Sequence, residues 1–371
     1  MTSCFWSSTF NFKTFRLRVM LIDMTDWQRH FENLAIKPEP HQLRAAVLAA
    51  RGNKAEGREN MLGAMTWAAF SCPSATQAVY DLIAQTWLTP DAEVEGSFFE
   101  DWAEAPISAD FWSKFWEAVH GPDEGYDALT ITQAIAALGG AVDDSFGSLA
   151  EQCANAHPGA NYAGEKTVPG LLSLQGLSEC PTGSLGHDLY CLLSANGFDP
   201  EVLDRNAIML SALPPALQYL NTRILQMHDV WHLVAGYTTD SIHEVAISSF
   251  QLAQFGHNYS AMFLATAGQI AHRNNPAGFR AFFQVIAEAW QHGRTTPPMM
   301  AIDWEQQFDQ PIDEIRDRFG ISPFESRLPP NLIESLSTGP LWRKWLPIWK
   351  VIRLHRWLQS SQSKLALQPA R

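Results

Sequence analysis

The chain has 371 residues, of which 46% are apolar, and a formal net charge of −13. This length and apolar content allow a large buried core, whereas the acidic balance argues against nucleic-acid binding. No run reaches the roughly 18 uninterrupted apolar residues of a membrane-spanning helix. The five cysteines, at positions 4, 72, 153, 180 and 191, form no C-x-x-C pair. Their scatter favours a reducing compartment over a secreted disulfide framework.

Residues 1–23 are basic and aromatic. Charges break their apolar stretch and no small-residue cleavage site is evident, so a secretory signal is disfavoured. Two interpretations stay open. The segment is either a targeting or disordered extension, or the product of an upstream start codon, with Met24 opening the protein.

Residues 24–160 are predicted to form a helical N-terminal region. The segment AAVLAARG indicates a helix that stops at Gly52. Further helices are predicted at residues 60–71, 111–120 and 131–148, the last interrupted by Gly139-Gly140. Residues 157–170 are rich in Pro, Gly, Asn and Ala and predict a loop.

Residues 161–325 carry the clearest helical pattern. Pro215 suits the first turn of a long helix that ends at Gly236. The other helices are predicted at 184–195, 242–255, 259–272, 277–292 and 313–318, with Gly256 and Gly293 as stops. Successive helices with short connections predict an all-α, multi-helix bundle-like domain with a helical N-terminal extension.

Residues 326–371 form a basic, Trp-rich tail. Seven Lys or Arg residues and no acid follow Pro340, so the rest of the chain carries −13 minus 7, or −20. Trp and basic side chains together are typical of interfacial anchoring, which predicts contact with a membrane surface. The alternative is a helix packed on the body or on a partner.

The segment MHDVWHLVAGYTTDSIHEVA carries the candidate chemistry. His228 and His232 lie one helical turn apart on one face, a spacing at which two imidazoles can hold one metal ion. Asp229 lies about 100° around the same helix and can be a ligand or orient a histidine. After the turn at Gly236, Glu244 can fold back toward His232. This set suits zinc or another first-row divalent metal.

Each of these residues also has an ordinary structural interpretation. A His pair at this spacing occurs by chance in many helices, and Asp229 could be a surface charge. Ser241-x-x-Glu244 is a capping-box pattern, in which the Glu bonds the backbone at the helix start. A zinc protease is disfavoured because Asp229 replaces the Glu of H-E-x-x-H.

H-D-x-x-H followed after eleven residues by Glu resembles the mark of ubiquinone (coenzyme Q) biosynthesis protein four, the "Coq four" family. Here the pattern is HDVWH, then LVAGYTTDSIH, then Glu244. Upstream, CPTGSLGHDLYCLLSANGFDP resembles the family's P-x-G-S-L-G-x-x-Y segment. Downstream, AWQHGRTTPPMMAIDWEQQFDQPIDEIRDRFGI resembles its Gly-Arg and Asp-Trp-Glu segments. The likeness spans roughly residues 170–321 and extends weakly back to Phe111, while residues 24–110 and the tail show nothing specific to the family.

The resemblance implies a metal held by His228, Asp229, His232 and Glu244, with Asp229 and His232 catalytic. It further implies oxidative decarboxylation of a polyprenylated benzoate, in which a hydroxyl replaces the ring carboxyl. The alternatives are a lipid-binding scaffold with a structural metal, and a metal-dependent hydrolase of prenyl phosphates that would need Arg223 or Arg294 near the metal.

The expected partners are a polyprenylated aromatic lipid, the membrane surface and other ubiquinone biosynthesis proteins, with a homodimer left open and no nucleic acid. The expected location is cytoplasmic, peripheral on the inner membrane surface of a bacterium, or on the equivalent organelle membrane. Arg294 is a candidate for binding the substrate carboxylate. The other interpretation of Arg294 is a cation that satisfies helix carbonyls.

Small residues on the helix after Gly236, and bulky ones on the next two helices, indicate a tight core. Some of these residues are expected to line a channel for the polyprenyl chain.

Overall fold

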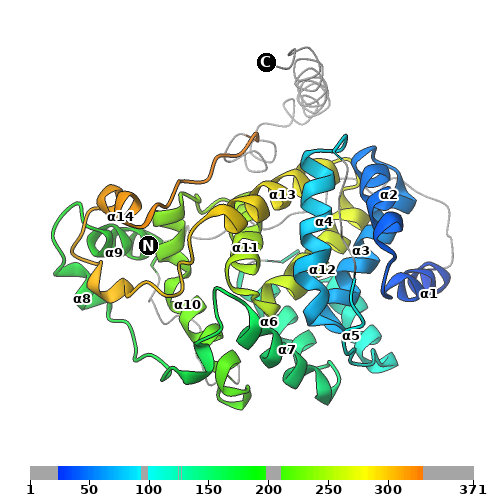
Figure 1. The fold of residues 1–371 in the computed structure, drawn as a ribbon, viewed down its shortest axis with the longest axis horizontal. Helices are drawn as coiled ribbons and strands as arrows, with labels where there is room; N and C mark the ends of the chain where they lie inside the picture. Colours follow the sequence, from blue (N-terminus) through cyan, green and yellow to red (C-terminus); the bar gives the residue numbers. More distant parts are fainter. Residues whose placement is uncertain (1–23, 93–98, 124, 127, 198–209, 329–371) are drawn as a thin grey trace, which may run out of the picture.

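The computed structural model describes residues 24–92, 99–123, 125–126, 128–197 and 210–328, and within these ranges it contains α-helices and no strand (Figure 1). The helices are α1 (Met24–Leu34), α2 (Pro40–Arg51), α3 (Ala55–Phe70), α4 (Thr76–Leu88), α5 (Ala109–His120), α6 (Ala128–Gly139), α7 (Asp144–Ala156), α8 (Leu174–Ser178), α9 (Leu185–Asn196), α10 (Pro215–Ala235), α11 (Ser241–Phe255), α12 (Asn258–Asn274), α13 (Phe279–Thr295) and α14 (Ile312–Phe319). The predicted all-α fold is confirmed. In the described part of the chain, no helix is long and apolar enough to cross a membrane.

Helix α3 is buried on nearly every side, between α1 and α2 on one flank and α4 and α12 on the other (Figure 1). Its core stretch MLGAMTWAAF combines small residues with a few large ones and has no polar face. A helix that is apolar all round belongs in the interior of a protein. Helix α3 therefore forms the centre of the half of the molecule that the N-terminal helices build.

Helices α11 and α13 pack along much of their length and form the centre of the other half. The Ser249 hydroxyl donates to the Ile286 carbonyl at 2.9 Å across this contact. A Cβ at Gly293 would lie 2.8 Å from the Phe250 carbonyl oxygen, so only glycine allows the two backbones this approach. The prediction that Gly293 ends its helix was wrong, because α13 continues to Thr295.

The residues expected to form a tight core do so. Ala246, Ser249 and Ala253 on α11 are buried. The bulky residues of α12 and α13 that are also buried are Met262, Phe279, Phe282, Phe283 and Trp290, while Tyr259 and Phe263 are partly buried. These side chains fill the interior between α11, α12 and α13. A channel for a polyprenyl chain stays a prediction.

The two halves share one continuous hydrophobic core. Buried hydrogen bonds cross between them, from Trp87 Nε1 to Gln284 at 3.1 Å and from Trp290 Nε1 to Asp81 at 2.8 Å. The N-terminal helices thus pack directly on α12 and α13. The domain boundary expected near residue 160 stays a prediction, and residues 1–23 and 329–371, with the Trp-rich tail, lie outside the described residues.

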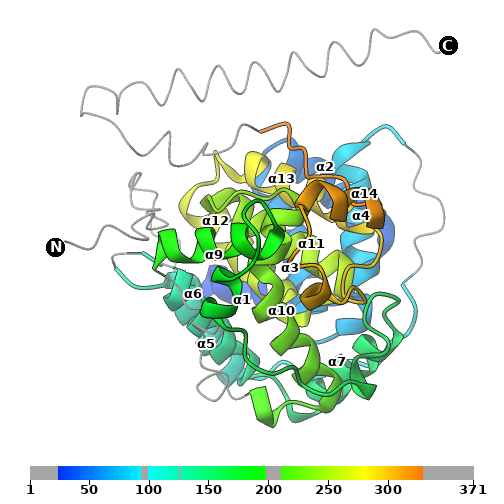
Figure 2. The ribbon, with the colours of Figure 1, turned by 90° about the vertical axis from the view of Figure 1, so that its left-hand side faces the viewer.

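Helix α10 runs along the edge of the α11–α13 layer and is bordered by α9, α14 and α7. Figure 2 looks onto this end of the molecule, with α9 and α14 near the upper part of α10. Both ends of α10 match the expectation, since Pro215 opens it and Gly236 caps it at a left-handed φ of 77°. The predicted helix at 131–148 is two helices, broken after Gly139.

Candidate metal centre

The C-terminal end of α10 is fixed by a segment that returns from far along the chain. Arg316 on α14 donates to the carbonyls of Val234 and Leu233 at 2.9 and 3.0 Å, and Phe324 N–H donates to the Ala235 carbonyl at 2.8 Å. These donors satisfy carbonyls that a helix end leaves free. A Cβ at Gly236 would lie 2.8 Å from the Pro323 side chain. The last turn of α10, which carries His232, is therefore held rigidly.

Helix α11 starts at Ser241, five residues after Gly236. Its N-cap is Asp240, whose carboxylate accepts from the backbone N–H groups of Ile242 and His243. The capping-box interpretation needs Ser241 as N-cap, so the observed cap differs from it. Glu244 points instead toward α10, where its two oxygens lie 3.3 Å from His228 Nε2 and 3.5 Å from His232 Nε2.

The structure brings three of the four predicted ligands, His228, Asp229 and His232, into one group. His228 Nε2 and His232 Nε2 are 3.0 Å apart. One ligand atom each from His228, Asp229 and His232 lies within 4.8 Å of the others, so these residues could hold a metal ion. The Glu244 carboxylate faces the same two nitrogens from α11. The cluster is thus formed by two consecutive helices and the turn between them.

The other nitrogen of each imidazole already has a partner. His232 Nδ1 is 3.2 Å from the Tyr237 carbonyl oxygen, which can only accept, so Nδ1 carries the proton. His228 Nδ1 is 2.8 Å from the Gln251 side-chain amide, whose oxygen and nitrogen can exchange places by a flip. With the Gln251 oxygen accepting from Nδ1–H, both Nε2 lone pairs face one point. Such partners are typical of metal-ligating histidines.

The electrostatics of the cluster follow mainly from the Glu244 carboxylate beside two imidazoles. Burial alone would raise the pKa of Glu244, but His232 and His228 reverse the effect and hold that pKa well below its ordinary range. Burial alone would lower the pKa of His232, but Glu244 outweighs it and raises the pKa above its ordinary value of 6.5. The site therefore favours a positive charge between the side chains of His228, His232 and Glu244.

The cluster lies at the surface rather than in the core. The His232 side chain is 1% exposed, whereas those of His228 and Glu244 are 30% and 24% exposed. Asp229 is also partly exposed. One side of the site is thus enclosed by protein, and the other is accessible to a small molecule or to one end of a larger one.

Both candidate arginines pair with carboxylates. Arg294 Nε donates to Asp81 on α4 at 3.1 Å, and it lies in the last turn of α13. Arg223 forms a two-pronged ion pair with Glu305. The role of Arg294 toward a substrate carboxylate stays a prediction. These ion pairs weaken the phosphate-hydrolase interpretation, which needed one of the two guanidiniums near the metal.

Five further histidines have protein partners. His292 accepts from the Tyr237 hydroxyl at 2.7 Å and donates to the Ser322 carbonyl at 2.8 Å. The remaining pairs are His243 with Thr238, His257 with Ser260 and Asn221, His272 with Glu59 and Arg58, and His187 with Cys191.

Sequence reasoning missed Gln251 and Arg316. Gln251 follows Glu244 by seven residues, two helical turns, so both face α10. A buried polar side chain inside the apolar run of α11 is the signal that could have identified it. Arg316 carried no such signal, because its contact with α10 is formed across 82 residues.

Comparison with known proteins gives matches to the same half of the chain. Residues 162–325 match the family model described as coenzyme Q (ubiquinone) biosynthesis protein Coq4. The mitochondrial ubiquinone biosynthesis protein COQ4 homolog of Rattus norvegicus is 30% identical over 172 residues, which are 45% of this chain and 59% of the rat protein. The mouse homolog is 31% identical over 166 residues, with the same coverage. The chain thus spans about 59% of the length of these relatives.

A crystal structure from Nostoc punctiforme, described as that of a ubiquinone biosynthesis protein, superposes with a TM-score of 0.45 at 24% identity, covering 57% of this chain and 97% of that one. The matched range of the family model contains α10, the turn at Gly236 and α11, and with them all four predicted ligands. Residues 162–325 of this chain are therefore similar to the Coq4 family of coenzyme Q biosynthesis proteins.

Proposed function

We propose that His228, Asp229, His232 and Glu244 bind one divalent metal ion. The observation that carries the proposal is the pair of Nε2 atoms 3.0 Å apart, each on a ring whose Nδ1 has its own partner. In the metal-free site these two nitrogens can share a proton in a hydrogen bond; when both Nδ1 atoms carry the protons, both Nε2 lone pairs are available to one metal ion. Glu244 supplies negative charge from the opposite helix. The donor set suits zinc best among the divalent ions, and other first-row metals also fit it.

The proposed role of the chain is in ubiquinone biosynthesis, acting on a polyprenylated benzoate precursor. The match of residues 162–325 to the Coq4 family model and the names of the relatives support it. The proposed reaction replaces the ring carboxyl with a hydroxyl. It balances as Ar–COOH plus O₂, two electrons and two protons, giving Ar–OH, CO₂ and H₂O. Dioxygen is the oxidant, and a two-electron donor outside the chain supplies the electrons.

Each side chain of the site has a separate role in the proposed reaction. Asp229 lies at the partly exposed edge of the cluster, where its carboxylate can take a proton from the substrate hydroxyl. His232 is held by the Tyr237 carbonyl and fixes the position of the buried side. When bound, the metal ion supplies Lewis-acid stabilisation of negative charge on the phenol and carboxylate oxygens of the substrate. The partial exposure of His228 and Glu244 leaves room for a substrate ring to approach.

The substrate also sets the location that we propose. A long isoprenoid chain resides in a membrane, so the protein must reach its substrate at a membrane surface. The rat, mouse and Eremothecium gossypii relatives are named as mitochondrial proteins. We therefore propose peripheral binding to a membrane, with other ubiquinone biosynthesis proteins as partners.

Complementation of cells that lack this protein tests the role. We expect such cells to lose ubiquinone and to accumulate a prenylated precursor that keeps its carboxyl group. Asp229→Ala and His232→Ala should fail to restore ubiquinone, whereas His187→Ala, a surface histidine on α9, should restore it. Normal ubiquinone with both site variants would support the non-catalytic, lipid-binding scaffold instead. Normal ubiquinone without the protein would contradict both roles.

A further inference from the structure

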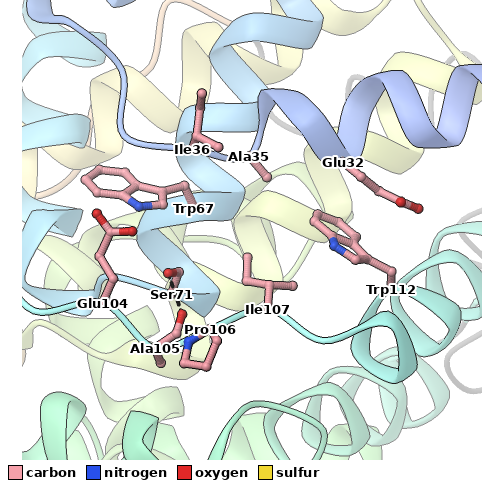
Figure 3. A pocket seen from close by; sticks show the side chains of 10 residues that line it. All are labelled: Glu32, Ala35, Ile36, Trp67, Ser71, Glu104, Ala105, Pro106, Ile107 and Trp112. Carbon is pink, nitrogen blue, oxygen red and sulfur yellow. Dashed lines mark hydrogen bonds between the residues drawn. The ribbon is translucent and has the colours of Figure 1, made fainter.

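A second hollow lies in the N-terminal half, away from the metal cluster. It has a volume of about 390 Å³ and is formed by the ends of α1 and α3, the loop before α5 and the first turn of α5 (Figure 3). That volume falls in the range of ligand-binding pockets, about 300–1,000 Å³. None of its lining residues belongs to α10 or α11. The hollow is therefore distinct from the candidate metal centre.

Hydrogen bonds hold the walls of the hollow in place. Ser71 at the end of α3 donates its hydroxyl to the Ala105 carbonyl at 2.6 Å and accepts from Ala105 N–H at 2.8 Å. Lys37, just after α1, donates to the Glu100 carbonyl at 3.0 Å and to Asp101 at 2.6 Å. These bonds tie the loop before α5 to α1 and α3. The shape of the hollow is thus set before anything enters it.

The lining is aromatic and acidic. Trp67 and Trp112 stand on opposite sides, and the carboxylates of Glu32 and Glu104 lie around the opening (Figure 3). No basic residue lines the hollow, and the nearby Lys37 is paired with Asp101. Trp67 is 1% exposed and forms the base of the hollow, whereas Trp112 is partly exposed. A partly exposed Trp beside carboxylates attracts an organic cation on an apolar stem. The Trp67 N–H has no hydrogen-bond partner among the described residues, so an occupant with a carbonyl oxygen would satisfy it.

Ile36 extends the apolar surface at the edge of the hollow, where its side chain is 62% exposed. A small cation would leave that side chain in water. A peptide that carries basic and apolar side chains would cover both the carboxylates and Ile36. The chemistry of the hollow therefore fits a basic, apolar peptide better than a free ion.

The chain itself contains such a peptide. Residues 341–358, LWRKWLPIWKVIRLHRWL, hold five Lys or Arg residues and four tryptophans without any acid. Near the end of the described residues, Arg327 pairs with Glu288 of α13 at 3.6 Å, and α13 packs on α4, which packs on α2. Helix α2 is 12 residues long, or about 18 Å, and its other end follows Ile36 closely. Fifteen residues join Leu328 to Lys344 and can span up to about 50 Å.

We propose that the hollow lined by Trp67, Trp112, Glu32 and Glu104 is the docking site for the basic tail, residues 341–358, of the same chain. A basic side chain enters beside Trp112, and its charge pairs with the rim carboxylates. Because an anionic membrane attracts the same basic residues, it competes with the hollow for the tail. Docking then keeps the tail on the protein until a membrane is reached. Of this proposal, only the competition between membrane and hollow for the tail rests on the proposed function.

Zero-length carbodiimide cross-linking of the full chain, followed by mass spectrometry, tests the proposal. The reagent joins a carboxylate to a lysine amine in direct contact. We expect cross-links from Glu32 or Glu104 to Lys344 or Lys350. Lys37–Asp101 and Lys114–Asp110, at 2.6 and 2.9 Å, are internal positive controls. Control cross-links without any tail cross-link would overturn the proposal.

Three further arms separate docking from general attraction to an acidic surface. Trp112→Ala keeps both carboxylates, yet it should reduce the tail cross-links by about two- to fivefold. Glu117→Gln, an exposed acid of α5 outside the hollow, should not change them. In a mixture of ¹⁵N-labelled and unlabelled protein, the cross-links should join peptides of one isotope. Mixed pairs would assign the hollow to the tail of a second copy and contradict the proposal.

Anionic vesicles should lower the yield of tail cross-links and leave the control cross-links intact. An unchanged yield with vesicles that bind the protein would contradict the competition. Neither arm depends on metal content or on ubiquinone production, so failure here would leave the proposed function standing. Conversely, loss of the metal by a ligand variant should not affect the cross-links.

Discussion

The metal cluster and the N-terminal hollow both combine carboxylates with rings, but they arrange them differently. In the cluster, the Nδ1 atoms of His228 and His232 have their own partners, and the two Nε2 atoms converge with Glu244 on one point. In the hollow, the carboxylates of Glu32 and Glu104 stand apart around tryptophan faces. Convergent lone pairs suit a compact metal ion, and separated charges over apolar walls suit an extended cationic chain. Geometry rather than composition distinguishes the two sites.

Removing a histidine from the cluster should have the largest effect. His232→Ala is expected to weaken divalent-metal binding by more than about 100-fold, because it removes a buried ligand from a shell of three or four. Titration with a competing chelator measures the affinity. His187→Ala removes a surface histidine and should bind metal like the unchanged protein. Equal affinities for the two variants would place the metal elsewhere.

Removing the partner of a ligand should have a smaller effect of the same kind. Gln251→Leu keeps the size of the side chain but leaves His228 Nδ1 without its hydrogen bond. Loss of such a partner typically costs about 10- to 100-fold in metal affinity. Ser248→Ala, on the neighbouring turn of α11, serves as the matched control. If Gln251→Leu binds metal with unchanged affinity, the amide does not orient the ring.

Metal binding should also depend on pH in a defined direction. The Glu244 carboxylate raises the pKa of His232 above 6.5, so the metal-free site retains a proton at higher pH than an ordinary histidine. Metal needs the neutral imidazole and must displace that proton, so affinity should fall by about tenfold per pH unit below the raised pKa. In Glu244→Gln the fall should begin at lower pH. Measured affinities between pH 5 and 8 decide this, and identical pH profiles would contradict it.

The smallest predicted effect concerns His257, which caps α12 behind the cluster. Burial, and then the charge of His228, lower its pKa to about 3. The folded protein resists protonation while the unfolded chain takes up a proton near pH 6.5. Stability is therefore full above pH 6.5 and falls as the pH drops toward 3. Between pH 7.5 and 5, this site costs at most about 2 kcal/mol.

Urea unfolding at those two pH values provides the check. The unchanged protein should lose more free energy of unfolding on acidification than His257→Gln, whose side chain does not titrate. Asn221 and Ser260 can still bond the glutamine amide, which keeps the comparison fair. Equal losses in the two proteins would mean that other groups carry the acid sensitivity.

The two sites also differ in how far the sequence alone predicts them. Pro215, Gly236 and Gly256 mark the ends of α10 and α11 by local backbone rules, so both helices and the face shared by His228 and His232 follow from spacing. The sequence alone does not decide that Glu244 faces α10, because Ser241-x-x-Glu244 also fits a capping box. Asp240, one residue before Ser241, is the N-cap instead, and the Glu244 side chain is directed at the histidines.

The remaining features depend on contacts between distant segments. In the sequence, Gly293 resembles a glycine that ends a helix. In the structure, it allows α11 to approach α13. Residues of the hollow come from positions 32 to 112 in four separate pieces, which no spacing pattern unites. The rim carboxylates and tryptophans are therefore unremarkable in the sequence. Their function emerges only when α1, α3 and α5 pack together.

The central claim is that one metal ion is shared by α10 and α11, and elemental analysis of purified protein tests it most directly. The unchanged chain should contain about one divalent ion, and a single change on either helix, His228→Ala or Glu244→Ala, should remove most of it while the helical circular dichroism spectrum stays the same. Full metal content in both variants would contradict the account.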